Sequence, residues 1–180
     1  MMGDYFRKMA GTTQSPPRAG LAEILWSWLG AFLGIGLVAY LNQPLVEKTD
    51  LILLIGSYGA TAVLIYGAIK SPLAQPRNLV GGHLISAFIG VSVYKLLTPY
   101  PWLAAAVAVA TSIALMHATK TLHPPGGATA LIYVMVSPKI HNLGFLYVLV
   151  PVAAGVTLML LVALLVNNLS PRRRYPEFWW

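Results

Sequence analysis

Apolar residues fall into six blocks, separated by short connections that are polar or rich in glycine and proline. The blocks cover residues 21–41, 51–69, 79–97, 102–119, 124–137 and 144–168. A membrane-spanning helix needs about 20 apolar residues, with a usual range of roughly 17–25. The block at 124–137 corresponds to about 21 Å of helix, which is short for a full crossing. We therefore predict an all-α membrane protein of six transmembrane or half-membrane helices.

Two topologies fit these blocks, and both place the two termini in the cytoplasm. Six crossings give nine cytoplasmic and three external Lys or Arg residues, whereas four crossings with 51–69 and 124–137 as re-entrant segments give seven and five. Cytoplasmic loops carry an excess of Lys and Arg, so the six-crossing arrangement is favoured. Its nine cytoplasmic residues are Arg7, Lys8, Arg18, Lys70, Arg77, Lys120, Arg172, Arg173 and Arg174, and its external ones are Lys48, Lys95 and Lys139.

A duplicated sequence divides the blocks into two units. The stretch "GSYGATAVLIY" (56–66) matches "PPGGATALIY" (124–133), and both contain the tetrad Gly-Ala-Thr-Ala. We predict units at 21–97 and 98–168, flanked by an N-terminal tail (1–20) and a basic, aromatic C-terminal tail (169–180). Three crossings in each unit give an inverted repeat, a pattern shared by many transporters, whereas the four-crossing alternative gives parallel repeats. Two further pairs follow in the same order: Ser71-Pro72 with Ser137-Pro138, and Asn78-Leu79 with Asn142-Leu143.

The composition supports a membrane protein and narrows its substrate. Only 9% of the residues are charged, against about 25% in a soluble chain. The net charge of +7 is spread between the apolar blocks, which indicates membrane topology and attraction to anionic lipid rather than nucleic-acid binding. Between Asp50 and Glu177 there is no carboxylate, although cation pathways and proton relays in membranes usually need one. The amides, hydroxyls, imidazoles and cations that remain suit a small anion.

The strongest candidate site is the segment "LHPPGGATALIY" (122–133). Proline is tolerated in the first turn of a helix, so the two prolines predict a helix start, and the two glycines allow close approach to the backbone. A helix start presents free N–H groups and a partial positive charge, which favour anions. In two inverted units, two such starts face each other across one anion. The predicted contacts are His123, Pro124, Pro125, Gly126, Gly127 and Thr129 in the second unit, and Gly56, Ser57, Gly59 and Thr61 in the first.

The alternative interpretation is that these small-residue motifs only pack helices against one another. Three further residues are assigned to the site. Arg77 and Asn78 lie at a helix start near the mouth of the pathway, and His83 lies one to two turns inside an apolar stretch.

The four histidines lack a zinc-site spacing, and no catalytic motif or cofactor-binding motif is present. We therefore expect no metal, no cofactor and no enzymatic activity.

Three stretches of the chain, "GSYGATAVLIY", "SPLAQPRNLVGGHLISAFIGVSVYKL" and "TLHPPGGATALI", resemble the HPP family of integral membrane proteins. The family takes its name from the triplet found here at His123-Pro124-Pro125. Its members are usually described as having four membrane helices, and plant plastid members are implicated in nitrite transport. The resemblance therefore implies a transporter or channel for a small monovalent anion, with nitrite the leading substrate.

The remaining expectations concern location and assembly. We expect an integral protein of a bacterial inner membrane with both termini in the cytoplasm. The partners are then the anion and membrane lipid, with no nucleic acid. A chain of 180 residues has little protein to shield a pathway, so a homo-oligomer is expected.

Overall fold

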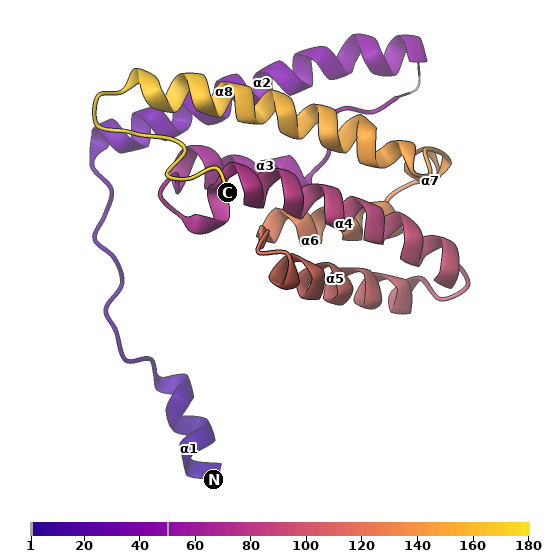
Figure 1. Ribbon diagram of the computed structural model, residues 1–180, viewed down its shortest axis with the longest axis horizontal. Coiled ribbons are helices and arrows are strands. Elements are labelled where there is room, and N and C mark those ends of the chain that lie inside the picture. The colour runs from indigo at the N-terminus through magenta and orange to yellow at the C-terminus, as the bar shows by residue number, and fades with distance from the viewer. Residues whose placement is uncertain (1, 50) are drawn as a thin grey trace.

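The computed structural model describes residues 2–49 and 51–180, and these residues form helices without any strand. Within them, four helical segments are long and apolar enough to cross a membrane. They are α2 (Leu21–Thr49), α4 (Pro76–Leu97), α5 (Pro101–Ala118) and Val148–Leu169, which combines η4 (Val148–Ala153) with α8 (Ala154–Leu169) (Figure 1). The predicted all-α membrane protein is thus confirmed, with four spans by length and composition.

The two remaining apolar blocks form helices of about half the spanning length. The first contains α3 (Ser57–Ala62) and the wider turn η2 (Val63–Gly67), and the second contains α6 (Pro124–Met135). Each is about 17–18 Å long at 1.5 Å per residue, against a hydrocarbon thickness of about 30 Å. The predicted half-membrane length of the 124–137 block is therefore confirmed. Four spanning helices agree with the four-span alternative, and the inverted arrangement of six helices stays a prediction.

The block at 51–69 is helical over a shorter stretch than its composition suggests. Residues 51–55 are not helical. The side-chain oxygen of Asn42 accepts the backbone N–H groups of Leu53 and Leu54 at 2.7 and 2.9 Å. Asn42 of α2 thus binds backbone N–H groups that would bond within the helix if α3 began earlier in the chain.

Proline marks the start of several helices. Pro76, Pro101 and Pro124 occupy the first position of α4, α5 and α6, where the missing N–H is not needed and the fixed φ suits a helix. The helix start predicted at Pro124 is confirmed. The short elements are α1 (Met2–Arg7), η1 (Lys8–Ala10), η3 (Pro72–Ala74) and α7 (Pro138–Asn142).

The long helices enclose the two short ones. Helices α2 and α8 run together along one side of the bundle, α5 lies on the opposite side, and α3, α4 and α6 lie between them (Figure 1). Helix α4 packs against both α5 and α6, while α2 packs against α8 and η2. The N-terminal segment with α1 extends away from the bundle. The two tetrad helices therefore lie between the long helices, each with one buried face.

Close contact between α4 and α6 depends on residues without side chains. A Cβ on Gly126 would lie 2.7 Å from the carbonyl oxygen of Gly82, and one on Gly90 would lie 2.9 Å from that of Ala130. Such distances leave no room for a methyl group against backbone atoms. Glycines at this interface therefore allow the two helices to pack closely. This agrees with the alternative interpretation of the small-residue motifs.

The C-terminal tail is folded onto the bundle. Arg173 is buried, and its guanidinium donates to both carboxylate oxygens of Glu23 at 2.5 and 3.1 Å, and to the carbonyl of Tyr66 at 3.0 Å. Further along, the Tyr175 hydroxyl donates to the carbonyl of Ala74 at 2.7 Å. Arginines after a last span usually mark the cytoplasmic side, but this one fastens the tail to α2 and η2.

Candidate functional site

Five polar side chains meet in the interior of the bundle. They come from α3, α4, the residue before α6, and α6 itself, and each is at most 1% exposed. Polar groups at such depth are costly unless they bond to one another. We call this set the buried cluster: Ser57, Thr61, His83, His123 and Thr129.

The threonines of the two duplicated tetrads bind opposite edges of one imidazole. The hydroxyl oxygen of Thr61 lies 2.7 Å from Nε2 of His83. The hydroxyl oxygen of Thr129 lies 2.7 Å from Nδ1 of the same ring. The repeat detected in the sequence thus converges on a single side chain in the structure.

Two further contacts extend this arrangement. The Thr129 hydroxyl donates to Oγ of Ser57 at 2.9 Å, which joins α3 and α6 directly. On the other side, Nε2 of His123 lies 3.4 Å from the Thr61 oxygen, and the two imidazole rings are 4.9 Å apart. Nδ1 of His123 lies 2.8 Å from the carbonyl oxygen of Leu73. A carbonyl only accepts, so this nitrogen carries the hydrogen.

Helical periodicity accounts for this convergence. In each tetrad the Thr-Ala pair is buried, whereas Gly59 is exposed and Gly127 is half-buried. Residues four apart lie on one face of a helix. Accordingly, the Thr61 hydroxyl also reaches the carbonyl of Ser57 at 3.2 Å, and that of Thr129 reaches the carbonyl of Pro125 at 3.1 Å. Equal register in the two copies points both hydroxyls inward.

The helix starts offer fewer free amides than the sequence suggested. Pro124 and Pro125 have no N–H, and the N–H of Gly126 donates to the carbonyl of His123 at 2.8 Å. At the start of α3, the N–H groups of Tyr58 and Gly59 donate to carbonyls within the same turn. The groups gathered at the two helix starts are therefore side-chain hydroxyls and imidazoles rather than backbone amides.

Other predicted residues lie outside the buried cluster. Gly56, Gly59 and Pro124 are exposed. The side-chain amide of Asn78 donates to the carbonyl of Leu122 at 2.8 Å, which holds the segment that leads into His123. Arg77 lies over the ring of Phe178 in the C-terminal tail, 5.7 Å from its centre. Asn78 thus supports the buried cluster from outside, and Arg77 contacts the tail.

Comparison with known proteins places the chain in a family. The model of the HPP transmembrane region matches residues 16–176. The chain belongs to the HPP family. The suspected family membership is thus confirmed, and it covers both predicted units and the whole buried cluster.

Two curated relatives of this HPP chain are transmembrane proteins of Dictyostelium discoideum. One is 52% identical over 180 residues and the other 46% identical over 182 residues, each covering 98% of the chain. The aligned part makes up 57% and 63% of their lengths, so the chain spans about three fifths of each. No solved structure matches the chain. The integral membrane location is supported, while the bacterial inner membrane and the orientation of the termini stay predictions.

In this HPP chain, the three residues of the family triplet differ in their contacts. His123 belongs to the buried cluster, and the carbonyl of Pro125 accepts from Thr129. Pro124 is exposed and lines an apolar cavity between α5 and α6. The triplet thus supplies one imidazole and one acceptor to the interior and opens the helix that carries Thr129.

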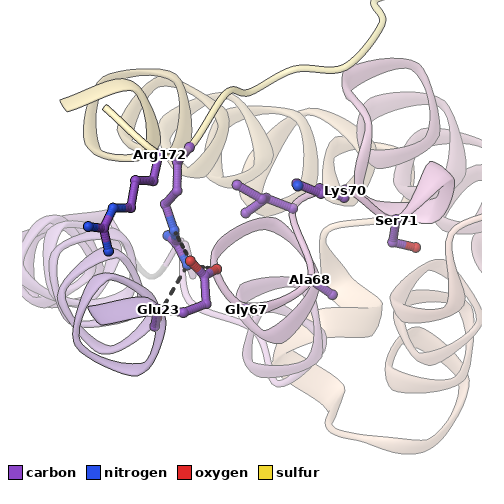
Figure 2. A pocket seen from close by; sticks show the side chains of 8 residues that line it. Glu23, Gly67, Ala68, Lys70, Ser71 and Arg172 are labelled. Carbon is purple, nitrogen blue, oxygen red and sulfur yellow. Dashed lines mark hydrogen bonds and ion pairs between the residues drawn. The ribbon is translucent and has the colours of Figure 1, made fainter. Parts of the chain in front are cut away.

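Sequence reasoning assigned no site role to a basic cleft at one end of the bundle. This cleft has a volume of about 430 Å³ and includes Glu23, Lys70, Ser71 and Arg172 among its lining residues. The side chains of Arg172 and Lys70 flank Glu23 in Figure 2. Residues 67–71 line the cleft, and the carbonyl of Leu73, two residues further along the chain, accepts from His123. Its signal in the sequence is the run of arginines at 172–174, which the topology prediction places in the cytoplasm.

Proposed function

We propose that this HPP chain is a transporter or channel for a small monovalent anion, with nitrite the leading substrate. One observation carries the proposal: hydroxyls from the two duplicated tetrads bind both nitrogens of His83 in the buried cluster. The choice of nitrite rests on the family resemblance. The choice of a small anion rests on the chemistry of the buried cluster.

The buried cluster has the groups that a small anion needs. Three hydroxyls and two imidazoles are donors when they turn toward a ligand. Hydrogen bonds to a charged acceptor are stronger than those between neutral groups, so an anion competes favourably for these donors. No carboxylate of the sequence lies between Asp50 and Glu177 to repel it. A cation bound in the same place would find hydroxyl and carbonyl oxygens but no compensating negative charge.

We propose that the basic cleft is the mouth of the pathway at one surface of the protein. Lys70 and Arg172 are exposed there, and cations that line a cleft raise the local concentration of anions and speed their arrival. We propose that the anion enters or leaves through this cleft and passes the 67–75 segment on its way to His123. We further propose transport without catalysis, contact with anionic lipid, and assembly into a homo-oligomer.

Flux in proteoliposomes tests the proposal. Purified chain is reconstituted, and uptake of nitrite, nitrate, formate and chloride is compared across a range of pH, with protein-free vesicles as a reference. Thr129→Val keeps the shape and removes one hydroxyl of the buried cluster, so flux falls by at least tenfold. The matched control is Thr157→Val on the exposed face of α8, which leaves the flux unchanged.

A second function, that of a non-transporting structural membrane protein, is favoured by one observation. Glycines let the backbones of α4 and α6 approach each other closely, as small residues do where membrane helices pack. A folded, reconstituted protein that carries none of the four anions would establish this second function. The same result would overturn the transport proposal.

A further inference from the structure

The buried cluster has fewer hydrogens than acceptors. The hydroxyl of Thr129 donates to Ser57 or to the carbonyl of Pro125. With the Thr129 hydrogen used in this way, the contact with Nδ1 of His83 at 2.7 Å takes the hydrogen of that nitrogen. A neutral imidazole carries one N–H, so Nε2 of His83 is then an acceptor.

The shortage is located at Thr61. Its single hydroxyl hydrogen faces three acceptors: the carbonyl of Ser57 at 3.2 Å, Nε2 of His83 at 2.7 Å and Nε2 of His123 at 3.4 Å. The other nitrogen of His123 already holds its hydrogen toward Leu73. With these directions, at least one imidazole nitrogen is left without a donor. One additional proton on the pair of rings supplies the missing donor.

Among the titratable groups near the buried cluster, the His83–His123 pair is the one placed to balance the charge of a bound anion. From α3, Tyr58 meets the edge of the His83 ring at 5.9 Å between centres, and Tyr147 donates to the carbonyl of Thr129 at 2.9 Å. Lys70 and Lys120 are exposed in loops, and His117 is exposed on α5. Arg77, at the start of α4, contacts the tail. None of these groups is a carboxylate, and none of the cations belongs to the buried cluster.

Placing an anion in a dry interior without a counter-charge costs many kcal/mol. The two imidazoles are the ionisable groups of the buried cluster, and a proton on either ring makes the loaded centre neutral. We propose that the chain carries its anion together with one proton held by the His83–His123 pair, so that transport is an electroneutral proton–anion symport. This inference rests on the proposed anion transport and adds its coupling ion.

The proton balance is simple and involves no covalent step. A proton from water on the loading side adds to Nε2 of His83 or His123, the anion binds to the N–H and hydroxyl groups, and both leave on the other side. The carbonyl of Leu73 takes no proton, so that contact holds the orientation of the His123 ring and the Thr61 side is where the proton is exchanged.

Vesicle measurements separate coupling from transport itself. Nitrite uptake is followed together with internal pH, first with an acid-outside gradient and then with a potassium diffusion potential. Symport predicts faster uptake under the pH gradient, one proton entering per nitrite, and no effect of the potential. Uptake driven by an inside-positive potential without proton entry would overturn symport and leave anion transport standing. No flux of any anion would remove both proposals.

Nitrous acid crosses lipid unaided, so protein-free vesicles set the background, and nitrate serves as an anion that is not protonated in water. If nitrate is carried at all, it also enters with one proton, which then comes from the protein. The double variant His83→Gln/His123→Gln abolishes the proton entry, whereas His117→Gln on the exposed part of α5 leaves it intact. Proton entry that persists in the double variant would overturn the assignment to this pair.

A measurement on the unmodified protein avoids dependence on how the variants fold. In weakly buffered detergent solution, addition of nitrite raises the pH of the solution by an amount equal to one proton taken up per anion bound. Anion binding without proton uptake would contradict the symport proposal directly.

Discussion

The two tetrad helices contain the same four residues but are held in different ways. Helix α6 begins at two prolines, and its neighbour α4 approaches it at Gly126 and Ala130 with backbone against backbone. Helix α3 has no such contact. A Cβ on Gly59 would meet nothing within 4 Å, and Gly56 and Ala60 are exposed.

What holds α3 and η2 instead is a set of long side chains. The hydroxyls of Tyr58 and Tyr66 donate to the carbonyls of Pro151 and Met159 at 2.7 and 3.0 Å, and Arg173 caps the carbonyl of Tyr66. We predict that side-chain contacts shift more readily than backbone packed against backbone, so that α6 is the fixed half of the buried cluster and α3 the more adjustable half.

The largest effect on stability is expected from Gly126→Val, which places a side chain at the contact of α6, the fixed half, with α4. The added carbon would lie 2.7 Å from the carbonyl of Gly82 and 2.8 Å from Oγ of Ser86, and α4 is also packed against α5 and η4. We expect a loss of stability of about 3 kcal/mol or more, measured as a fall in the midpoint of thermal unfolding in detergent. Normal stability of this variant would mean that α6 is not fixed by α4.

Arg173→Ala tests the adjustable half. It removes the donors to Glu23, Ser27 and the carbonyl of Tyr66. Breaking a fully buried pair costs about 3–5 kcal/mol, but Glu23 keeps contact with water, so about 2 kcal/mol is the expected loss. Hydrogen exchange should quicken at 57–67 and stay unchanged at 124–135. The exposed Arg172→Ala is the matched control, and equal quickening in both helices would contradict the comparison.

The coupling between the two halves is tested by removing their hydroxyls together. Thr61→Val and Thr129→Val each leave a buried nitrogen of His83 without its partner, at a cost of about 1–3 kcal/mol. Because both threonines bind the same ring, the effects on stability should not add, and the double variant should differ from the sum by about 0.5 kcal/mol or more. Additive losses would mean that the imidazole does not connect the two tetrads.

The sequence was sufficient for the elements that depend on local chemistry. Apolar length indicated the spanning helices, the prolines indicated the start of α6, and the repeated tetrad indicated that Thr61 and Thr129 are equivalent. Helical periodicity then made both hydroxyls face inward. These features follow from residues close together in the chain, so their patterns are visible without a structure.

Contacts between distant segments could not be anticipated. The carbonyl of Leu73 reaches His123 across 50 residues, and Arg173 reaches Glu23 across 150. Neither partner has a distinctive sequence signature, since one is a backbone carbonyl and the other belongs to a run of arginines typical of a membrane boundary. The prediction of free amides at the helix starts was wrong for a different reason. The prolines that mark the start of α6 have no N–H group, so they also remove its first hydrogen-bond donors.

The smallest change in stability, and the sharpest test of the equivalence of the halves, comes from Gly59→Ala and Gly127→Ala. A methyl group meets nothing within 4 Å at the first position and only Cγ1 of Val109 at 3.8 Å at the second. Each variant should therefore change stability by less than about 1 kcal/mol, with a small gain from reduced backbone freedom. If both glycines are present to let an anion approach the backbone, nitrite flux falls in both variants while the unfolding midpoint stays the same. Unchanged flux in both would confine the anion to the inward Thr-Ala faces, and a fall in one alone would show that only that half of the repeat admits it.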